Sequence, residues 1–141
     1  MKTNTLIFLL QIAGLMHIGL IAAGLLMPRV VNLRANLAVL PNFIRRLYWV
    51  YYAFIGLCLV GFGSISFVLA KELAAGAPLA RVMCAFFALF WTLRLVAATF
   101  IFDVRPYLTT GFLRLGYHAT NVAFAYLPLA YALAAWKGGA K

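Results

Sequence analysis

Two ionisable side chains interrupt apolar runs of this sequence and could make polar contacts inside a membrane. Arg94 lies in the run FWTLRLVAATFIF, and His17 lies in the first apolar run. Both lie about 12–15 Å, at 1.5 Å per helical residue, from the same end of the predicted spans. An unpaired charge in hydrocarbon costs about 2.5–3.5 kcal/mol or more, so Arg94 needs partners. The predicted intramembrane polar site consists of Arg94, His17, Trp91 and Asn121.

Two arrangements would give the guanidinium of Arg94 the partners that it needs. It could belong to a polar network that joins helices, which is the commoner case, or it could contact a bound ligand or lipid headgroup. Trp91 lies one helical turn before Arg94 on the same face, so a cation–π contact with the indole is available.

The two histidines could also act as haem ligands, because paired imidazoles on different helices can hold a haem iron. His118 lies near the start of the predicted fourth span, about 10 Å shallower than His17, which makes joint ligation of one iron difficult. We expect histidines hydrogen-bonded within the bundle and no bound cofactor. The alternative is a redox protein that holds haem b or quinone through His17, His118 and Arg94.

Aromatic and basic residues gather where the predicted spans reach one membrane surface. Aromatic side chains beside hydrogen-bond donors suit an amphipathic ligand with a polar head. The candidate residues for such a ligand, or for a lipid headgroup, are Tyr48, Tyr52, Arg105, Tyr107, Tyr117 and His118. The same residue types form the ordinary aromatic belt of membrane proteins, which is the simpler explanation.

Residues for other chemistry are scarce. The chain has two acidic residues and two histidines, which provide no carboxylate pair and no metal cluster of usual spacing. Cys58 and Cys84 stand alone in apolar runs, without a CxxC motif, and the sequence has no glycine-rich phosphate loop. We therefore expect neither an enzyme nor a metal protein.

The composition indicates which solvent these residues meet. Of 141 residues, 67% are hydrophobic and 10% are charged, whereas soluble domains have about 25% charged residues. Such a chain is suited to lipid. The net charge of +10 comes from lysines and arginines that, except for Arg94, lie at or beyond the ends of apolar runs. There they meet lipid phosphates and set topology, so the charge indicates membrane lipids rather than nucleic acid as partners.

Four continuous apolar runs are each long enough to cross a bilayer, which takes about 20 helical residues. They cover residues 4–27, 44–70, 79–102 and 113–136. Strands of a membrane barrel would alternate apolar and polar residues, which these runs do not. The sequence predicts an all-α polytopic membrane protein, a single domain over residues 1–141 with four transmembrane helices in a compact bundle.

The connections predict further features. Between Pro28, which we expect to end the first span, and Pro41, apolar and polar residues fall on separate stripes, which predicts a short interfacial helix. The connection KELAAGAPLAR contains Gly76 as a helix stop, so we expect the second and third spans to be antiparallel neighbours. Small residues such as Gly14 and Gly63 allow close helix contacts within one chain or between chains.

We predict a small non-enzymatic membrane protein that is an accessory or assembly subunit or that binds lipid. Its partners would be membrane lipids together with further copies of itself or the subunits of a larger membrane complex. An oligomeric channel or transporter for a small anion, with Arg94 and His17 on its path, is a further alternative. From the small size and general character of the chain, we expect a bacterial inner membrane. By the positive-inside rule, the basic residues that flank the first span would place both termini away from the cytoplasm.

Overall fold

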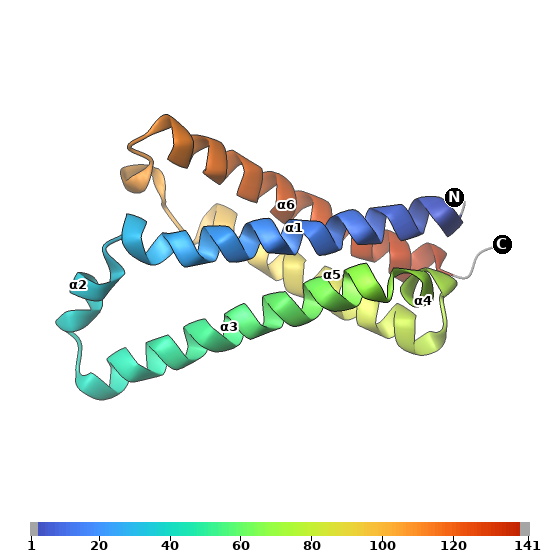
Figure 1. Cartoon of the computed structure of the whole chain (residues 1–141), viewed down its shortest axis with the longest axis horizontal. Helices are drawn as coiled ribbons and strands as arrows, with labels where there is room; N and C mark the ends of the chain where they lie inside the picture. Colours follow the sequence, from blue (N-terminus) through green and yellow to red (C-terminus); the bar gives the residue numbers. More distant parts are fainter. Residues whose placement is uncertain (1–2, 139–141) are drawn as a thin grey trace.

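The structure is a computed structural model that describes residues 3–138. The long helices are α1 (Thr3–Val30), α3 (Asn42–Val68), α5 (Pro78–Phe100) and α6 (Gly111–Lys137). The short helices are α2 (Leu33–Ala38), α4 (Ala70–Ala75) and the 3₁₀ helix η1 (Arg105–Tyr107). The first turn of α1 and the last turn of α6 lie at the same end of the bundle (Figure 1).

The four long helices are long and apolar enough to cross a membrane. The shortest has 23 residues and the longest 28. At 1.5 Å per residue they are about 35–42 Å long, against a hydrocarbon core of about 30 Å. This confirms the prediction of an all-α protein with four transmembrane helices in a compact bundle, and the chain is accordingly a small integral membrane protein.

The helices form two antiparallel pairs. α1 packs along α3, α5 packs along α6, and contacts between α1 and α6 join the pairs (Figure 1). The expected side-by-side packing of the second and third spans is not present, since α3 and α5 meet mainly through Phe62, whose ring centroid lies 4.5 Å from that of Phe87. The reason is α4, which buries Leu73 and Ala74 and packs mainly against α1, so the connection is more than a tight hairpin.

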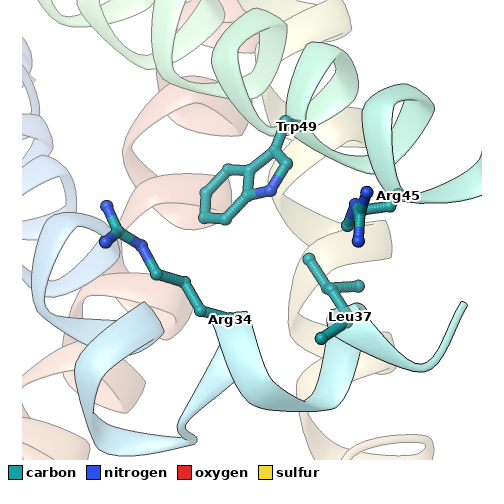
Figure 2. A pocket seen from close by; sticks show the side chains of 5 residues that line it. Arg34, Leu37, Arg45 and Trp49 are labelled. Carbon is teal, nitrogen blue, oxygen red and sulfur yellow. The ribbon is translucent and has the colours of Figure 1, made fainter. Parts of the chain in front are cut away.

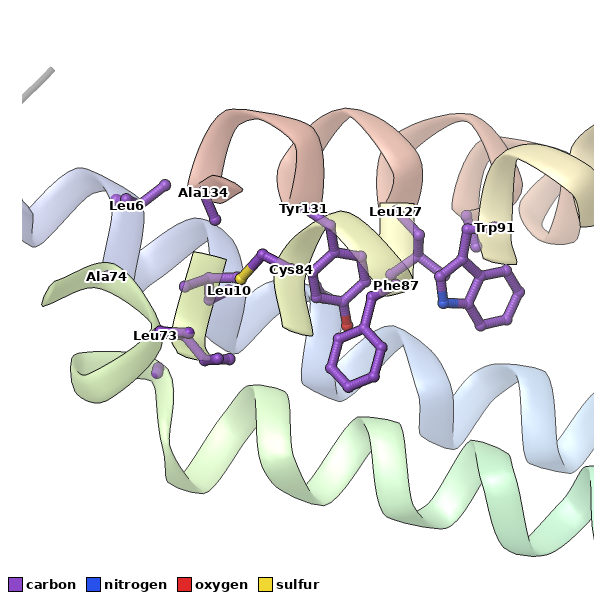
Figure 3. Packing of buried hydrophobic residues seen from close by; sticks show 14 of the residues in the cluster. Leu6, Leu10, Leu73, Ala74, Cys84, Phe87, Trp91, Leu127, Tyr131 and Ala134 are labelled. Atoms are coloured by element: carbon purple, nitrogen blue, oxygen red, sulfur yellow. The ribbon is translucent and has the colours of Figure 1, made fainter. Parts of the chain in front are cut away.

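The buried core lies in the half of the bundle near the first turn of α1, which we call the closed end. The buried residues of α1 fall between Leu6 and Leu20, and those of α6 between Ala123 and Ala134. Figure 3 shows Phe87, Trp91 and Tyr131 packed together in this core. Toward the opposite end, which holds α2 and η1 and which we call the open end, the long helices separate (Figure 1).

A tyrosine secures α1 where a proline interrupts its hydrogen bonding. Pro28 lies inside α1, which continues to Val30, so the prediction that Pro28 ends the span is wrong. Because proline has no N–H, the carbonyl of Gly24, four residues earlier, loses its helical partner. The hydroxyl of Tyr52 on α3 donates to that carbonyl instead. This bond ties α3 to α1 on the open side of the core.

The interfacial helix predicted between Pro28 and Pro41 is present as α2. It follows Asn32, whose φ of 48° lies in the left-handed region, where asparagine is found more often than most residues. Leu37 is buried and Arg34 is exposed, so α2 has the two-sided character of a helix at a membrane surface.

Candidate functional site: two arginine positions at the open end and a buried polar pair

At the centre of the bundle, His17 on α1 contacts Trp91 on α5. Their ring centroids are 5.2 Å apart with planes at 81°, and the side chains are only 1% and 2% exposed. Nδ1 of His17 donates to the carbonyl oxygen of Ala13 at 2.7 Å, so Nε2 of the neutral ring is an acceptor. Within residues 3–138, neither Nε2 of His17 nor Nε1 of Trp91 has a hydrogen-bond partner. The pair therefore holds one buried acceptor and one buried donor close together.

A glycine contact between α1 and α3 fixes His17 in this position. A Cβ atom on Gly63 would lie 2.8 Å from Cβ of His17, and one on Gly14 would lie 2.7 Å from Cβ of Phe67. Only glycine at both positions lets the two helices approach so closely. The imidazole is consequently enclosed between α3 and α5.

Arg94 on α5 is exposed and lies against two phenyl rings. Its Cζ atom is 5.5 Å from the ring centroid of Phe102, beyond the end of α5, and 5.4 Å from that of Phe124 on α6. The rings that contact the guanidinium are therefore different from the indole of Trp91, which faces inward and packs on His17 and Phe124. Within residues 3–138, Arg94 has no hydrogen bond and no ion pair.

The four residues of the predicted intramembrane polar site are thus only partly brought together. His17 and Trp91 are in contact, and Arg94 is linked to Trp91 through the ring of Phe124, which lies 5.7 Å from the indole. Asn121 is half-buried on α6, and its side chain makes no hydrogen bond to any residue between 3 and 138.

The geometry around the histidines does not fit a haem held between them. His17 is buried together with its Nε2 atom, with Gly63 against its Cβ atom and the ring of Trp91 against its imidazole. His118 is exposed on α6, and its ring packs on Tyr117 with centroids 5.4 Å apart. One imidazole is therefore inside the bundle and the other is on its surface.

The candidate headgroup residues lie on three elements of the open end. Tyr48 and Tyr52 stack on α3 with ring centroids 6.3 Å apart, whereas Tyr117 and His118 contact each other on α6. Within residues 3–138, no hydrogen bond or aromatic contact joins the α3 pair to the α6 pair. Tyr52 is also occupied by the carbonyl of Gly24, which gives it a structural role.

The remaining two candidates, Arg105 and Tyr107, belong to η1. The backbone N–H of Arg105 donates to the Asp103 carboxylate at 3.1 Å, and both candidate side chains are exposed. Nearby, Nε of Arg114 donates to the carbonyl of Leu108 at 3.3 Å. These bonds shape the connection between α5 and α6 and leave the guanidinium of Arg105 directed to its surroundings.

Sequence reasoning missed a hollow between α2 and the first turns of α3. It measures about 370 Å³ and is lined by Arg34, Leu37, Ala38, Arg45 and Trp49. Figure 2 shows the guanidinium groups of Arg34 and Arg45 on opposite sides of the hollow, with the indole of Trp49 above it. The signal in the sequence is two arginines eleven positions apart around Pro41, but only the fold shows that both line one hollow.

The second hollow lies on the outer side of α5 and α6 near the closed end. It measures about 540 Å³ and is lined by Arg81, Ala85, Ala88, Ala132, Ala135 and Trp136. Nε of Arg81 donates to the carbonyl of Ala135 at 2.9 Å, which holds α5 against the last turns of α6. Small side chains form its floor, and no titratable group other than Arg81 lines it.

The acidic residues of the chain do not reach these positions. Glu72 lies on α4 at the closed end, and Asp103 accepts the backbone N–H of Arg105 at the open end. Neither carboxylate lines the hollow between α2 and α3. The open end therefore presents an excess of guanidinium groups to the membrane surface.

Comparison of the chain with protein-family models, with curated protein sequences and with solved structures finds no match.

Proposed function

We propose that this small integral membrane protein binds an anionic lipid at its open end, with the headgroup in the hollow between α2 and α3. The observation that carries the proposal is the pair of guanidinium groups of Arg34 and Arg45, which face one hollow without a carboxylate in its lining. Lipid binding of this kind needs no catalytic residue, and it suits an accessory subunit as well as a protein that acts alone.

The chemistry of the hollow favours a phosphate group. Arginine presents planar, bidentate donors that match phosphate oxygens. The terminal nitrogen Nη2 of Arg45 donates to Oδ1 of Asn42 at 3.0 Å, which orients the guanidinium and leaves its other donors for a ligand. Arg34 makes no hydrogen bond within residues 3–138, so its donors are available as well.

The other lining residues favour a lipid over a free phosphate ion. Trp49 is a residue type found at headgroup depth, where its ring contacts acyl chains and its N–H contacts polar groups. It is held by edge-on contacts with Tyr48 and Tyr52, at centroid distances of 6.1 Å and 5.7 Å. Leu37 supplies an apolar surface below the arginines. The hollow therefore has a cationic rim and an apolar interior.

Native mass spectrometry of the full chain in detergent tests the proposal. The probes are phosphatidylglycerol and phosphatidylcholine with identical acyl chains, and the variant is Arg34→Gln with Arg45→Gln. We expect the wild type to retain phosphatidylglycerol preferentially and the variant to bind it at least about tenfold more weakly, since a hydrogen bond to a charged group contributes about 1.5–3 kcal/mol.

The matched control is Arg29→Gln with Arg46→Gln, which removes the same charge from exposed arginines of the same end that do not line the hollow. The control is expected to keep most of the affinity. An equal loss of phosphatidylglycerol affinity in both double variants would indicate diffuse attraction to the basic surface. It would contradict a specific binding site in the hollow. That the protein resides in a bacterial inner membrane and that it self-associates both stay predictions from the sequence.

A further inference from the structure

Arg94 is a second position where the protein presents a guanidinium without a partner, and it lies within a membrane-spanning helix. It is six residues before the end of α5 at Phe100, about 9 Å along the helix axis. Its side chain is exposed, and its contacts are with the rings of Phe102 and Phe124. Aromatic rings stabilise a cation, but they do not accept its N–H groups in strong hydrogen bonds as an anion does.

Within residues 3–138, neither acidic residue of the chain forms an ion pair with Arg94. The two acidic residues are Glu72 and Asp103, and both lie outside the four long helices. The guanidinium is therefore available to an anionic group of another molecule.

The side of α5 that carries Arg94 is accessible from the bilayer. One turn earlier on the same side, Phe90 contacts Phe62 of α3, with ring centroids 5.1 Å apart. Beyond that contact α3 packs along α1 and not along α5, so it does not cover the next turn of α5. An amphiphile in the surrounding leaflet can reach Arg94 without any opening of the core.

We propose that Arg94 binds the phosphate or carboxylate head of a membrane amphiphile, drawn below the membrane surface and flanked by Phe102 and Phe124. The planar guanidinium supplies up to five N–H donors, which suits either head. The two rings cover part of the guanidinium, and the low dielectric of the surrounding lipid strengthens its pairing with an anion. This site is separate from the hollow that Arg34 and Arg45 line, so either proposal can fail alone.

NMR of labelled probes added to the full chain in detergent micelles tests the inference. The probes are oleate labelled with ¹³C at its carboxylate and phosphatidate observed by ³¹P. We expect at least one probe to give a bound signal that depends on Arg94, with one head per chain at this site in addition to any head held by Arg34 and Arg45. The affinity of that signal should fall at least about tenfold in Arg94→Gln. Arg94→Lys should bind with intermediate affinity, since it keeps the charge and loses the planar donors.

The controls separate this site from the rest of the open end. Arg105→Gln removes a charge at the same end but outside the spans and should keep the Arg94-dependent signal. The double variant Arg34→Gln with Arg45→Gln should keep it too, whatever it loses at the hollow. A signal from oleate alone or from phosphatidate alone identifies the source of the anion and supports the proposal. If neither probe gives a signal that depends on Arg94, the proposal is overturned, and an intramembrane carboxylate of a partner subunit becomes the explanation.

Discussion

Substitution of Gly14 by alanine should separate α1 from α3 and destabilise the bundle. The added Cβ would lie 2.7 Å from Cβ of Phe67, 2.9 Å from its backbone nitrogen and 3.0 Å from the carbonyl oxygen of Gly63. Ordinary contact begins near 3.4 Å, so the helices must move apart by about 0.7 Å, the difference from 2.7 Å. Two of the three atoms belong to backbone and cannot rotate away. Overpacking of this kind costs about 1–3 kcal/mol.

Gly19→Ala is the matched control, because a Cβ on Gly19 of the same helix meets nothing within 4 Å. Both substitutions gain about 0.8–1 kcal/mol of helix propensity, so the difference between them isolates the steric cost. Unfolding of the detergent-solubilised chain, followed by circular dichroism, measures that difference. Equal unfolding free energies for Gly14→Ala and Gly19→Ala would refute the close approach of α1 and α3.

Two further predictions concern hydrogen bonds between helices. Ser66→Ala and Tyr131→Phe each remove the 2.5 Å hydrogen bond between the two hydroxyls. Each should lower the free energy of unfolding by about 1 kcal/mol. In a double-mutant cycle, the double variant should lose little more stability than either single variant. Additive losses would mean that the hydroxyls act independently. Tyr52→Phe leaves the Gly24 carbonyl unpaired and should lower the free energy of unfolding by about 1–3 kcal/mol. Adding Pro28→Ala to the same chain restores the helical N–H that this carbonyl lacks. Thermal unfolding should therefore show that the double variant recovers most of the lost stability.

The spans were predictable because continuous apolar runs have one stable form in lipid, and the predicted limits lie within a few residues of the helix ends. The prediction went wrong where tertiary contacts decide local structure. The segment AKELAA became α4 because Leu73 and Ala74 pack on α1, and Pro28 stays inside α1 because Tyr52 replaces its missing bond. Neither contact leaves a periodic signal in the sequence.

The candidate site was harder to predict for a related reason. Depth along a helix can be counted from sequence, and this count is what singled out His17 and Arg94 as candidates. Which ring a side chain meets depends on helix rotation and crossing, so Phe124 and Phe102, rather than Trp91, contact Arg94. The position of Arg34 and Arg45 on opposite sides of one hollow depends on how α2 folds back on α3.

The arrangement of the bundle as two antiparallel pairs has a consequence for its assembly during synthesis. α1 to α4 are complete before α5 and α6 leave the ribosome, so each pair can enter the membrane as its own hairpin. Several side-chain contacts then join the hairpins, among them Tyr126 donating to the Leu9 carbonyl at 2.9 Å and the bond between Ser66 and Tyr131. A chain divided after Gly76 should therefore reassemble by fragment complementation when both halves are co-expressed, and co-purification of the halves would be lost when these bonds are removed together.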